Sequence, residues 1–437
     1  MKPRRSGESA PARSGVPCAW RIAGGQALRA SLPALLVLGC GGVTESGAPV
    51  SKRLRAEPVA LDAGWPSRLP RFATATGKRL AIGWVEEGAQ GAKEAAVELR
   101  FAEWLRGAWA EPRRVAGGER WFVNWTDFPG LAILGERNLI GWFLQRSEEG
   151  TYDYQVMLVR SQDAGRTWSE PVRLHDDPGP GEHGFVSLVP LDERSCAAVW
   201  LDGRNAREHE AGTEGGAMGL YVRSVWADGT LGPETALDER VCDCCPTAAV
   251  LSADGSLLVA YRDRSEEELR DISLVRFANG SAPERVWDSG DGWKIAGCPV
   301  NGPALAREGD LAALVWFTLG GDGEARVLCA FSDDDGKHFA EPLRIAGERA
   351  LGRVDAVFDD QGCLVVAWLE DGDPSAAWRV ARVDPEAGLL DGHSVAATDP
   401  SRDSGLARLA RIPGGILFAW TDLAGSPRVQ VKKLAWE

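Results

Sequence analysis

The sequence predicts an all-β protein, a β-propeller of seven four-stranded blades. The first observation is a short apolar run that ends in an aromatic residue and recurs seven times, at intervals of about 50 to 60 residues. The second is composition, because each run has the length of a strand and is rich in Val, Ile, Leu and aromatic residues. The runs end at Trp84, Trp142, Trp200, Tyr261, Trp316, Trp368 and Trp420.

The flanks of each run, the third observation, supply the other strands of a blade. A shorter strand precedes the run across an Asp-Gly or similar turn, as at 248–255. An alternating strand follows it, as at 155–159, and a fourth strand begins near a Glu-Pro pair such as 170–171. Four antiparallel strands joined by tight turns are typical of a propeller blade.

The two ends of the chain predict how the ring closes. The last repeat stops after its third strand, and the segment 56–61 has the pattern of a fourth strand without a repeat of its own. We expect this segment to complete the last blade, because closure removes two exposed sheet edges. Residues 56–437 then form a single propeller domain. A six-bladed ring with one strand pair outside it is the alternative.

The N-terminal segment is expected to be an export signal. Residues 1–30 are basic, and the apolar run 32–38 that follows is too short to span a membrane. The residues around Cys40 resemble a bacterial lipobox, so residues 1–40 are predicted to be a signal peptide with Cys40 as the lipidation site. An ordinary signal peptide is the alternative. Residues 41–55 would be a linker, and the protein an exported, membrane-anchored lipoprotein of a bacterial envelope, periplasmic or at the cell surface.

Charge restricts the partners. The formal net charge is −14 at pH 7, whereas binding to nucleic-acid phosphates needs a basic surface. We therefore expect no nucleic-acid partner, contact with the membrane only through the lipid anchor, and a monomer.

Two turn motifs carry a resemblance to a known family. Residues 161–168 read SQDAGRTW, which is an Asp-box (S-x-D-x-G-x-T-W), and residues 332–339 are a near match with His338 in place of Thr. Together with the repeats, they make the chain from about residue 56 resemble the sialidase superfamily of propellers. It looks most like uncharacterised sialidase-like envelope proteins of bacteria. Asp163 and Asp334 are expected to be structural, because Asp and hydroxyl side chains in such turns bind nearby backbone groups.

One face of the propeller is expected to hold the ligand pocket. Loops that enter the first strand of each blade and loops that leave the second share this face, around the central axis. They are rich in Arg, Asp, Trp and Cys, which indicates a polar pocket for a carbohydrate or another small anionic ligand. The predicted binding residues are Trp125, Asn124, His183, Arg204, Arg262, Asn301 and Asp355.

The resemblance implies the chemistry of a sialidase. In that family an arginine cluster holds the sugar carboxylate, a Tyr activated by a Glu is the nucleophile and an Asp is the acid. Arg68 lies in a segment similar to the family's Arg-Ile-Pro motif, Arg264 and Arg353 could complete the cluster, and Asp127 is the predicted acid. The predicted function is a propeller that acts on or recognises an anionic glycan. No Tyr lies where the family's nucleophile belongs, so a non-catalytic binding propeller is the alternative.

Four cysteines lie in loops of the same face. They are Cys242, Cys244, Cys245 and Cys298. Export favours disulfides among them, so we expect a disulfide clamp and no cofactor. The alternative is a soft-metal site, with His183 as a further ligand, which would make the chain a metal or redox protein.

Overall fold

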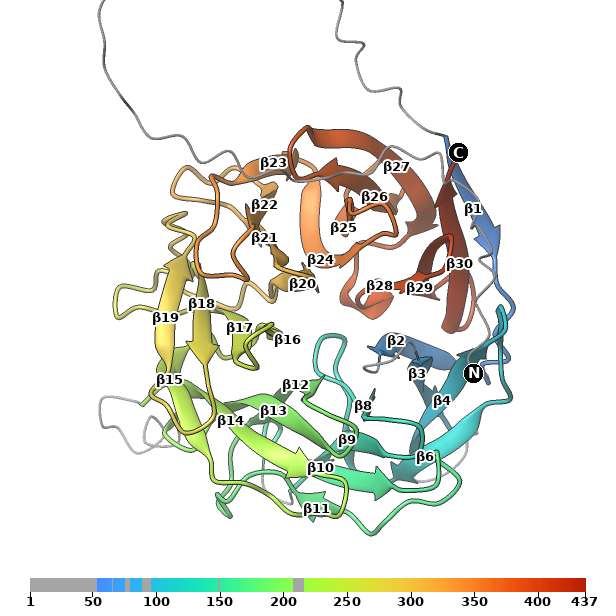
Figure 1. Cartoon of the computed structure of the whole chain (residues 1–437), viewed down its shortest axis with the longest axis vertical. Coiled ribbons are helices and arrows are strands. Elements are labelled where there is room, and N and C mark those ends of the chain that lie inside the picture. The colour runs from blue at the N-terminus through green and yellow to red at the C-terminus, as the bar shows by residue number, and fades with distance from the viewer. Residues whose placement is uncertain (1–52, 65, 75–78, 89–95, 148–149, 207–215) are drawn as a thin grey trace, which may run out of the picture. The chain divides into compact units, whose positions relative to one another are not determined.

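The computed structural model describes residues 53–64, 66–74, 79–88, 96–147, 150–206 and 216–437. Within the unit Ser51–Glu437, seven antiparallel sheets follow one another around a ring (Figure 1). The predicted seven-bladed propeller is confirmed, and the six-bladed alternative is wrong. Among the described residues, no helix has the length and apolar character that crossing a membrane would require.

The blades are named A to G in chain order, and their strands run from the channel outwards. Blade A contains β2 (Ser67–Thr74), β3 (Leu80–Glu87), β4 (Val97–Leu105), β5 (Ala108–Trp109) and β6 (Arg113–Gly118). Blade B contains β7 (Trp121–Phe122), β8 (Gly130–Ile133), β9 (Leu139–Arg146), β10 (Tyr154–Ser161) and β11 (Val172–Arg173). Blade C contains β12 (His183–Pro190), β13 (Ser195–Asp202), β14 (Met218–Trp226) and β15 (Thr235–Val241).

The remaining blades repeat this plan. Blade D contains β16 (Ala248–Leu251), β17 (Leu257–Arg262), β18 (Ile272–Phe277) and β19 (Glu284–Asp288). Blade E contains β20 (Ala304–Glu308), β21 (Leu311–Thr318), β22 (Arg326–Ser332) and β23 (Leu343–Ala346). Blade F contains β24 (Ala350–Phe358), β25 (Leu364–Glu370), β26 (Ala376–Asp384) and β27 (Gly388–Thr398). Blade G contains the 3-10 turn η2 (Arg402–Ser404), β28 (Arg408–Ile412), β29 (Gly415–Asp422), β30 (Arg428–Trp436) and β1 (Leu54–Pro58).

The repeated aromatics lie on the second strands and form the core between blades. Trp84, Trp200 and Trp316 are fully buried. Second strands are apolar on both faces because each blade packs against two neighbours; all but the last residue of β25 are buried. Replacing one of these tryptophans with alanine would cost about 3–5 kcal/mol.

The N-terminal strand closes the ring. β1 pairs antiparallel with β30, with Ala56 opposite Leu434, and the two strands lie together at the rim in Figure 1. The predicted closing strand is thereby confirmed, although it starts at Leu54, inside the predicted linker. Residues 1–52, which include the predicted signal peptide and Cys40, lie outside the described residues.

Both Asp-boxes form the expected turns between the third and fourth strands of blades B and E. The carboxylate of Asp163 accepts hydrogen bonds from the Thr167 amide at 2.9 Å and the Thr167 hydroxyl at 2.7 Å. In the second turn, Asp334 accepts from the His338 amide at 2.9 Å and contacts the His338 ring at 2.6 Å. Histidine thus replaces threonine without loss of either contact.

Candidate functional site

A central channel of about 570 Å³ runs between the first strands of the blades. Its lining is set by one position that all seven blades share. In each blade, the first-strand residue that pairs with the position before the repeated aromatic lines the channel. In chain order these residues are Arg71, Leu131, Ser187, Ala248, Ala304, Asp355 and Arg408.

This ring of equivalent positions divides the channel into two halves. The charged members, Asp355, Arg408 and Arg71, come from blades F, G and A, which are consecutive because the ring closes between G and A. The other four members are small or apolar. At this ring of positions, charged side chains therefore lie on one side of the channel and small or apolar side chains on the other.

The two arginines of the charged half are partly buried and incompletely paired. Arg71 lies over the Phe128 ring at 4.8 Å and donates to the Val186 carbonyl at 3.3 Å. Arg408 approaches Asp355 at 3.8 Å. The Nε atoms of Arg71 and Arg408 are buried and have no hydrogen-bond partner among the described residues. Burial, with the nearby Arg408 cation, lowers the pKa of the Arg71 guanidinium to about 9.

Asp355 is the acidic group between them. Its carboxylate accepts a hydrogen bond from the Leu409 amide at 2.7 Å. Burial raises the pKa of this carboxyl, which opposes its ionisation. Among the seven equivalent positions, one carboxyl group thus stands against two arginines, and the Asp127 carboxyl also acts on Arg71. Such a site is chemically suited to an anion.

Three of the first strands, β2, β12 and β24, contain a residue with a strained backbone conformation. Leu69, Phe185 and Arg353 have φ values of 60°, 54° and 57°, a conformation that costs non-glycine residues about 1–3 kcal/mol each. Each lies at a register shift of its first strand. The amide of each donates to a side chain of the preceding blade: to Thr421 Oγ1 at 3.0 Å, Asp127 Oδ1 at 2.8 Å and Asn301 Oδ1 at 2.7 Å, respectively. These three contacts are the inter-blade latches.

The predicted acid, Asp127, lies in one of these latches. Its side chain is buried, and a Cβ atom on Gly184 would lie 2.0 Å from its Oδ2 atom. The hydroxyl of Tyr154 contacts that Oδ2 atom at 3.0 Å and Glu182 Oε1 at 2.7 Å. Burial raises the pKa of Asp127 to about 7 and that of Glu182 to about 8. One phenolic proton cannot satisfy two carboxylates, so this triad favours an additional proton.

Arg353, Trp125, Asn301 and Asp355 are predicted residues that the structure brings together. Asn301, Arg353 and Asp355 line the channel. The Arg353 guanidinium lies 4.5 Å from the centre of the Trp125 ring and donates to the Ser404 hydroxyl at 2.6 Å. It also donates to the carbonyls of Pro400, Ser401 and Gly405. Arg353 therefore fixes the loop before β28, which carries Arg408.

Arg68 and Arg264 lie outside the channel lining. Arg68 forms an ion pair with Glu87, and Arg264 donates to Glu268 at 2.8 Å. Two predicted binding residues hold loops instead: Asn124 accepts from the Thr126 amide, and the buried Arg262 donates to the carbonyls of Asn301 and Phe317. The arginine that reaches the channel from the Arg68 segment is Arg71, three residues later, because the strained Leu69 shifts the register.

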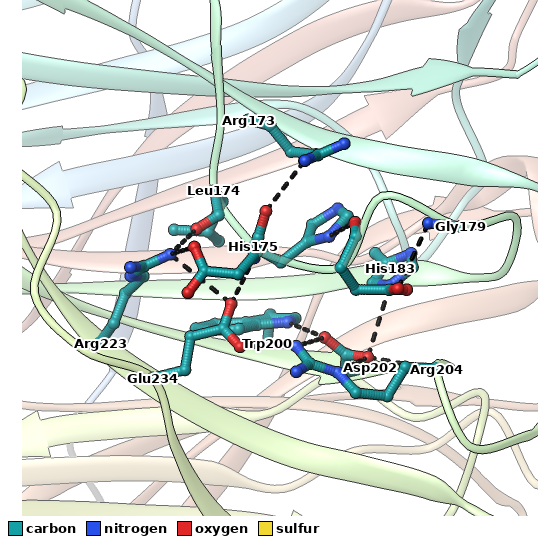
Figure 2. Close-up of polar contacts among 12 residues, drawn as sticks. Arg173, Leu174, His175, Gly179, His183, Trp200, Asp202, Arg204, Arg223 and Glu234 are labelled. Atoms are coloured by element: carbon teal, nitrogen blue, oxygen red, sulfur yellow. Dashed lines mark hydrogen bonds and ion pairs between the residues drawn. The ribbon is translucent and has the colours of Figure 1, made fainter.

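His183 and Arg204 belong to a separate buried cluster in blade C (Figure 2). Asp202 accepts two hydrogen bonds from Arg204, at 2.8 and 2.7 Å, and one from the Trp200 indole at 2.8 Å. His183 Nε2 lies 3.4 Å from Asp202 Oδ1, and Arg204 also reaches Glu234 at 2.8 Å. His183 Nε2 also lies 3.1 Å from Asp177 Oδ2, so Asp202 and Arg204 find their partners within this cluster.

The four loop cysteines are not joined by disulfide bonds in the structure, and the disulfide clamp stays a prediction. The Sγ atom of Cys242 lies 3.7 Å from that of Cys244 and 3.6 Å from that of Cys245, too far for an S–S bond of about 2.05 Å. Cys298, on the neighbouring entering loop, is close to Cys244. Thiol contacts from Cys244 and Cys245 lower the pKa of Cys242 well below its usual value.

The residues predicted from the sequence do not include Arg71, Arg408, Tyr154 or Glu182, although Glu182 lies beside His183 on an entering loop. Tyr154 lies on a third strand, where the family has no nucleophile, yet Asp127 and Glu182 from two entering loops both contact its hydroxyl. Arg71 and Arg408 could have been found by aligning the first strands on the repeated aromatics. However, Arg71 lies 13 residues before Trp84 and Arg408 lies 12 before Trp420, so spacing alone does not fix which side chains face inwards.

The comparisons with known proteins give structural neighbours only. No family model and no curated protein matches the chain. A protein of unknown function from Dyadobacter fermentans DSM 18053 is 11% identical with a TM-score of 0.46, over 88% of this chain and 99% of that one. An α-L-arabinanase from Penicillium chrysogenum, complexed with arabinobiose, is 12% identical with a TM-score of 0.46, over 89% and 98%.

A sialidase from Trypanosoma rangeli, in complex with the inhibitor DANA, is 11% identical with a TM-score of 0.43, over 72% of this chain and 56% of that one. The chain has the propeller and the two Asp-box turns on which its resemblance to the sialidase superfamily rests.

Proposed function

We propose that this protein recognises an anionic saccharide in its central channel. The observation that carries the proposal is that Arg71 and Arg408 line the channel from equivalent first-strand positions, with Asp355 between them in the ring and with no hydrogen-bond partner for either Nε atom among the described residues. Burying such an arginine costs free energy, because its guanidinium loses hydrogen bonds to water. A bound anion offsets this cost by accepting charge-assisted hydrogen bonds from the guanidinium.

The channel also suits the size of such a ligand. A volume of about 570 Å³ lies within the range of about 300–1,000 Å³ that is usual for small-molecule sites. The resemblance to sialidases supports a sugar acid, whose carboxylate would bind Arg71 and Arg408 while its ring lies against the apolar half of the channel. Export to the bacterial envelope, which stays a prediction from residues 1–40, would expose the channel to extracellular glycans.

The test is binding of matched sugars to the full chain by titration calorimetry. N-acetylneuraminic acid and galacturonic acid serve as carboxylate probes, and galactose as the neutral control. We expect a sugar acid to bind and galactose not to bind. We also expect Arg408→Gln to weaken the acid's binding by about 10- to 100-fold, as loss of a charge-assisted hydrogen bond does. Equal binding of galactose, or full binding by Arg408→Gln, would contradict the proposal.

Hydrolysis is a second candidate function, favoured by the triad of Asp127, Tyr154 and Glu182. These are the residue types that the resemblance implies for acid, nucleophile and activating carboxylate. The Tyr154 side chain is fully buried, so attack on a sugar would first require the triad to open towards the channel. A panel of fluorogenic sialosides and uronides tests this function. Turnover that is lost in both Tyr154→Phe and Asp127→Asn would establish it, and silence from folded protein would reject it.

A further inference from the structure

We propose that Cys242, Cys244, Cys245 and Cys298 form a thiolate site for a soft metal ion, Zn(II) or Cu(I), at the mouth of the channel. The sulfur geometry is the first argument. A tetrahedral ion bound at about 2.3 Å from each thiolate holds the sulfurs roughly 3.8 Å apart. The separations of 3.6 and 3.7 Å around Cys242 Sγ are close to this spacing.

The arrangement of the loops is the second argument. Cys242, Cys244 and Cys245 come from one entering loop, and all three sulfurs lie within 4.8 Å of one another. Cys298 comes from the next entering loop. Its sulfur lies within 4.8 Å of the Cys244 sulfur and of a carboxylate oxygen of Asp243. Cys298 is exposed while Cys242 and Cys245 are buried, so an ion can enter from the open face and exchange water for sulfur ligands.

Buried arginines offset the charge that the thiolates would bring. Arg270 Nη1 donates to Cys242 Sγ at 3.1 Å and to Asp243 Oδ1 at 3.2 Å, and its Nη2 donates to Glu268 at 2.6 Å. The Cys242 amide donates to the carbonyl of Arg262 at 2.9 Å, which fixes the loop. Such second contacts orient metal ligands and tune their affinity. An apolar pocket for four neutral thiols would need no guanidinium at this place.

The histidine pair of blade C does not offer an equivalent site. His175, His183 and Asp177 place donor atoms within 4.8 Å of one another. However, the imidazole rings are stacked 3.7 Å apart at an angle of 1°. Nitrogen lone pairs lie in the plane of the ring, so a single ion cannot lie in the planes of both rings. The cysteine cluster is therefore the stronger candidate, and its softness selects Zn(II) or Cu(I) over Mg(II) or Ca(II).

Co(II) is the spectroscopic probe, because thiolate-bound Co(II) absorbs strongly in the near ultraviolet. The full chain is reduced, freed of metal and titrated with Co(II), and bound Co(II) is then displaced with Zn(II) or Cu(I). We expect one strongly bound ion per chain and a thiolate charge-transfer band. Metal analysis of the protein as purified identifies which ion it carries.

The variants separate ligands from other cysteines. Cys242→Ser and Cys245→Ser should weaken binding by at least about tenfold and reduce the thiolate band. Cys329→Ala, which removes a buried thiol in blade E, should leave both unchanged. If Cys242→Ser fails to fold, the exposed Cys298→Ser and the partly exposed Cys244→Ser provide the same comparison. Absence of the band in the reduced parent, or the same band in all the ligand variants, would overturn the proposal, whichever result the sugar titrations give.

Discussion

Blade C and the central channel both hold clusters of arginine and carboxylate, but they differ in how completely their polar atoms are paired. In blade C, Asp202 is held by both arms of Arg204, by Trp200 and by His183, and Arg204 also reaches Glu234 (Figure 2). In the channel, Arg71 and Arg408 are partly buried, their Nε atoms lack partners among the described residues, and Arg408 lies 3.8 Å from Asp355.

Under our proposal, this difference in pairing separates a structural cluster from a binding site. When all polar groups of a buried cluster are paired within the fold (a closed cluster), these contacts offset the free energy of desolvation, and a ligand has no unpaired group to bind. When some of these groups have no partner (an open cluster), part of the desolvation cost is not offset until an anion binds. Under our proposal, two clusters of arginine and carboxylate therefore have different roles, set by the position of each guanidinium and by its partners.

The largest expected effect is on the closed cluster. Asp202→Ala should destabilise the fold by about 3–5 kcal/mol, because it removes the fully buried carboxylate that accepts from Arg204 and from the Trp200 indole. Urea unfolding followed by tryptophan fluorescence measures this loss. Arg408→Gln is the matched variant in the open cluster and should change stability by less than about 1 kcal/mol. Equal losses in the two variants would remove the distinction between the clusters.

The next effect is a pH dependence from the triad behind the channel wall. The pKa values of Asp127 and Glu182 are raised by burial to about 7 and about 8, whereas in the unfolded chain both groups titrate near pH 4. Between these pH values the folded state binds more protons on Asp127 and Glu182 than the unfolded state does. The free energy of unfolding should therefore fall by about 2–4 kcal/mol as pH rises from about 4 to about 8. Unfolding at pH 5 and pH 8.5 tests this, with Asp127→Asn as the control that should flatten the slope. A parent that is more stable at pH 8.5, or an unchanged slope in the variant, would contradict this account.

A smaller effect is expected on the open cluster when it is occupied. Sulfate at 100 times its dissociation constant should stabilise the parent by about 2.7 kcal/mol, because it binds the folded channel alone. Thermal unfolding in sodium sulfate, matched in ionic strength with sodium chloride, measures this gain. Arg71→Gln should lose most of it, since one of the two guanidiniums is gone. Stabilisation that is equal in parent and variant would place the anion elsewhere.

The smallest effects are expected for the two predicted arginines outside the channel. Arg68→Gln and Arg264→Gln each break a partly exposed ion pair, worth less than about 1 kcal/mol, and should leave sugar binding unchanged. Parallel titrations with the sugar acid check this. Binding lost in Arg68→Gln would restore the assignment that its sequence motif suggests and would weaken that of Arg71.

The sequence by itself determined the architecture of this protein. Seven apolar runs at regular spacing, the Asp-box turns and the unmatched strand near residue 56 lead to a closed seven-bladed ring, because each feature is local and repeats with the blade. It also determined which loops share a face, since chain direction alternates at every turn. Asn301, Arg353 and Asp355 were found by that rule, and they line the channel.

Tertiary structure alone decided the partners of the charged side chains. Positive φ at Leu69 and Arg353 shifts the register of two first strands, and such a shift changes which side chains of the strand face the channel. The contact of Tyr154 with Asp127 and Glu182 joins two entering loops to a third strand, and Cys298 meets Cys244 across two blades. These contacts depend on how neighbouring blades pack, and no local sequence pattern predicts the distance between side chains of two blades.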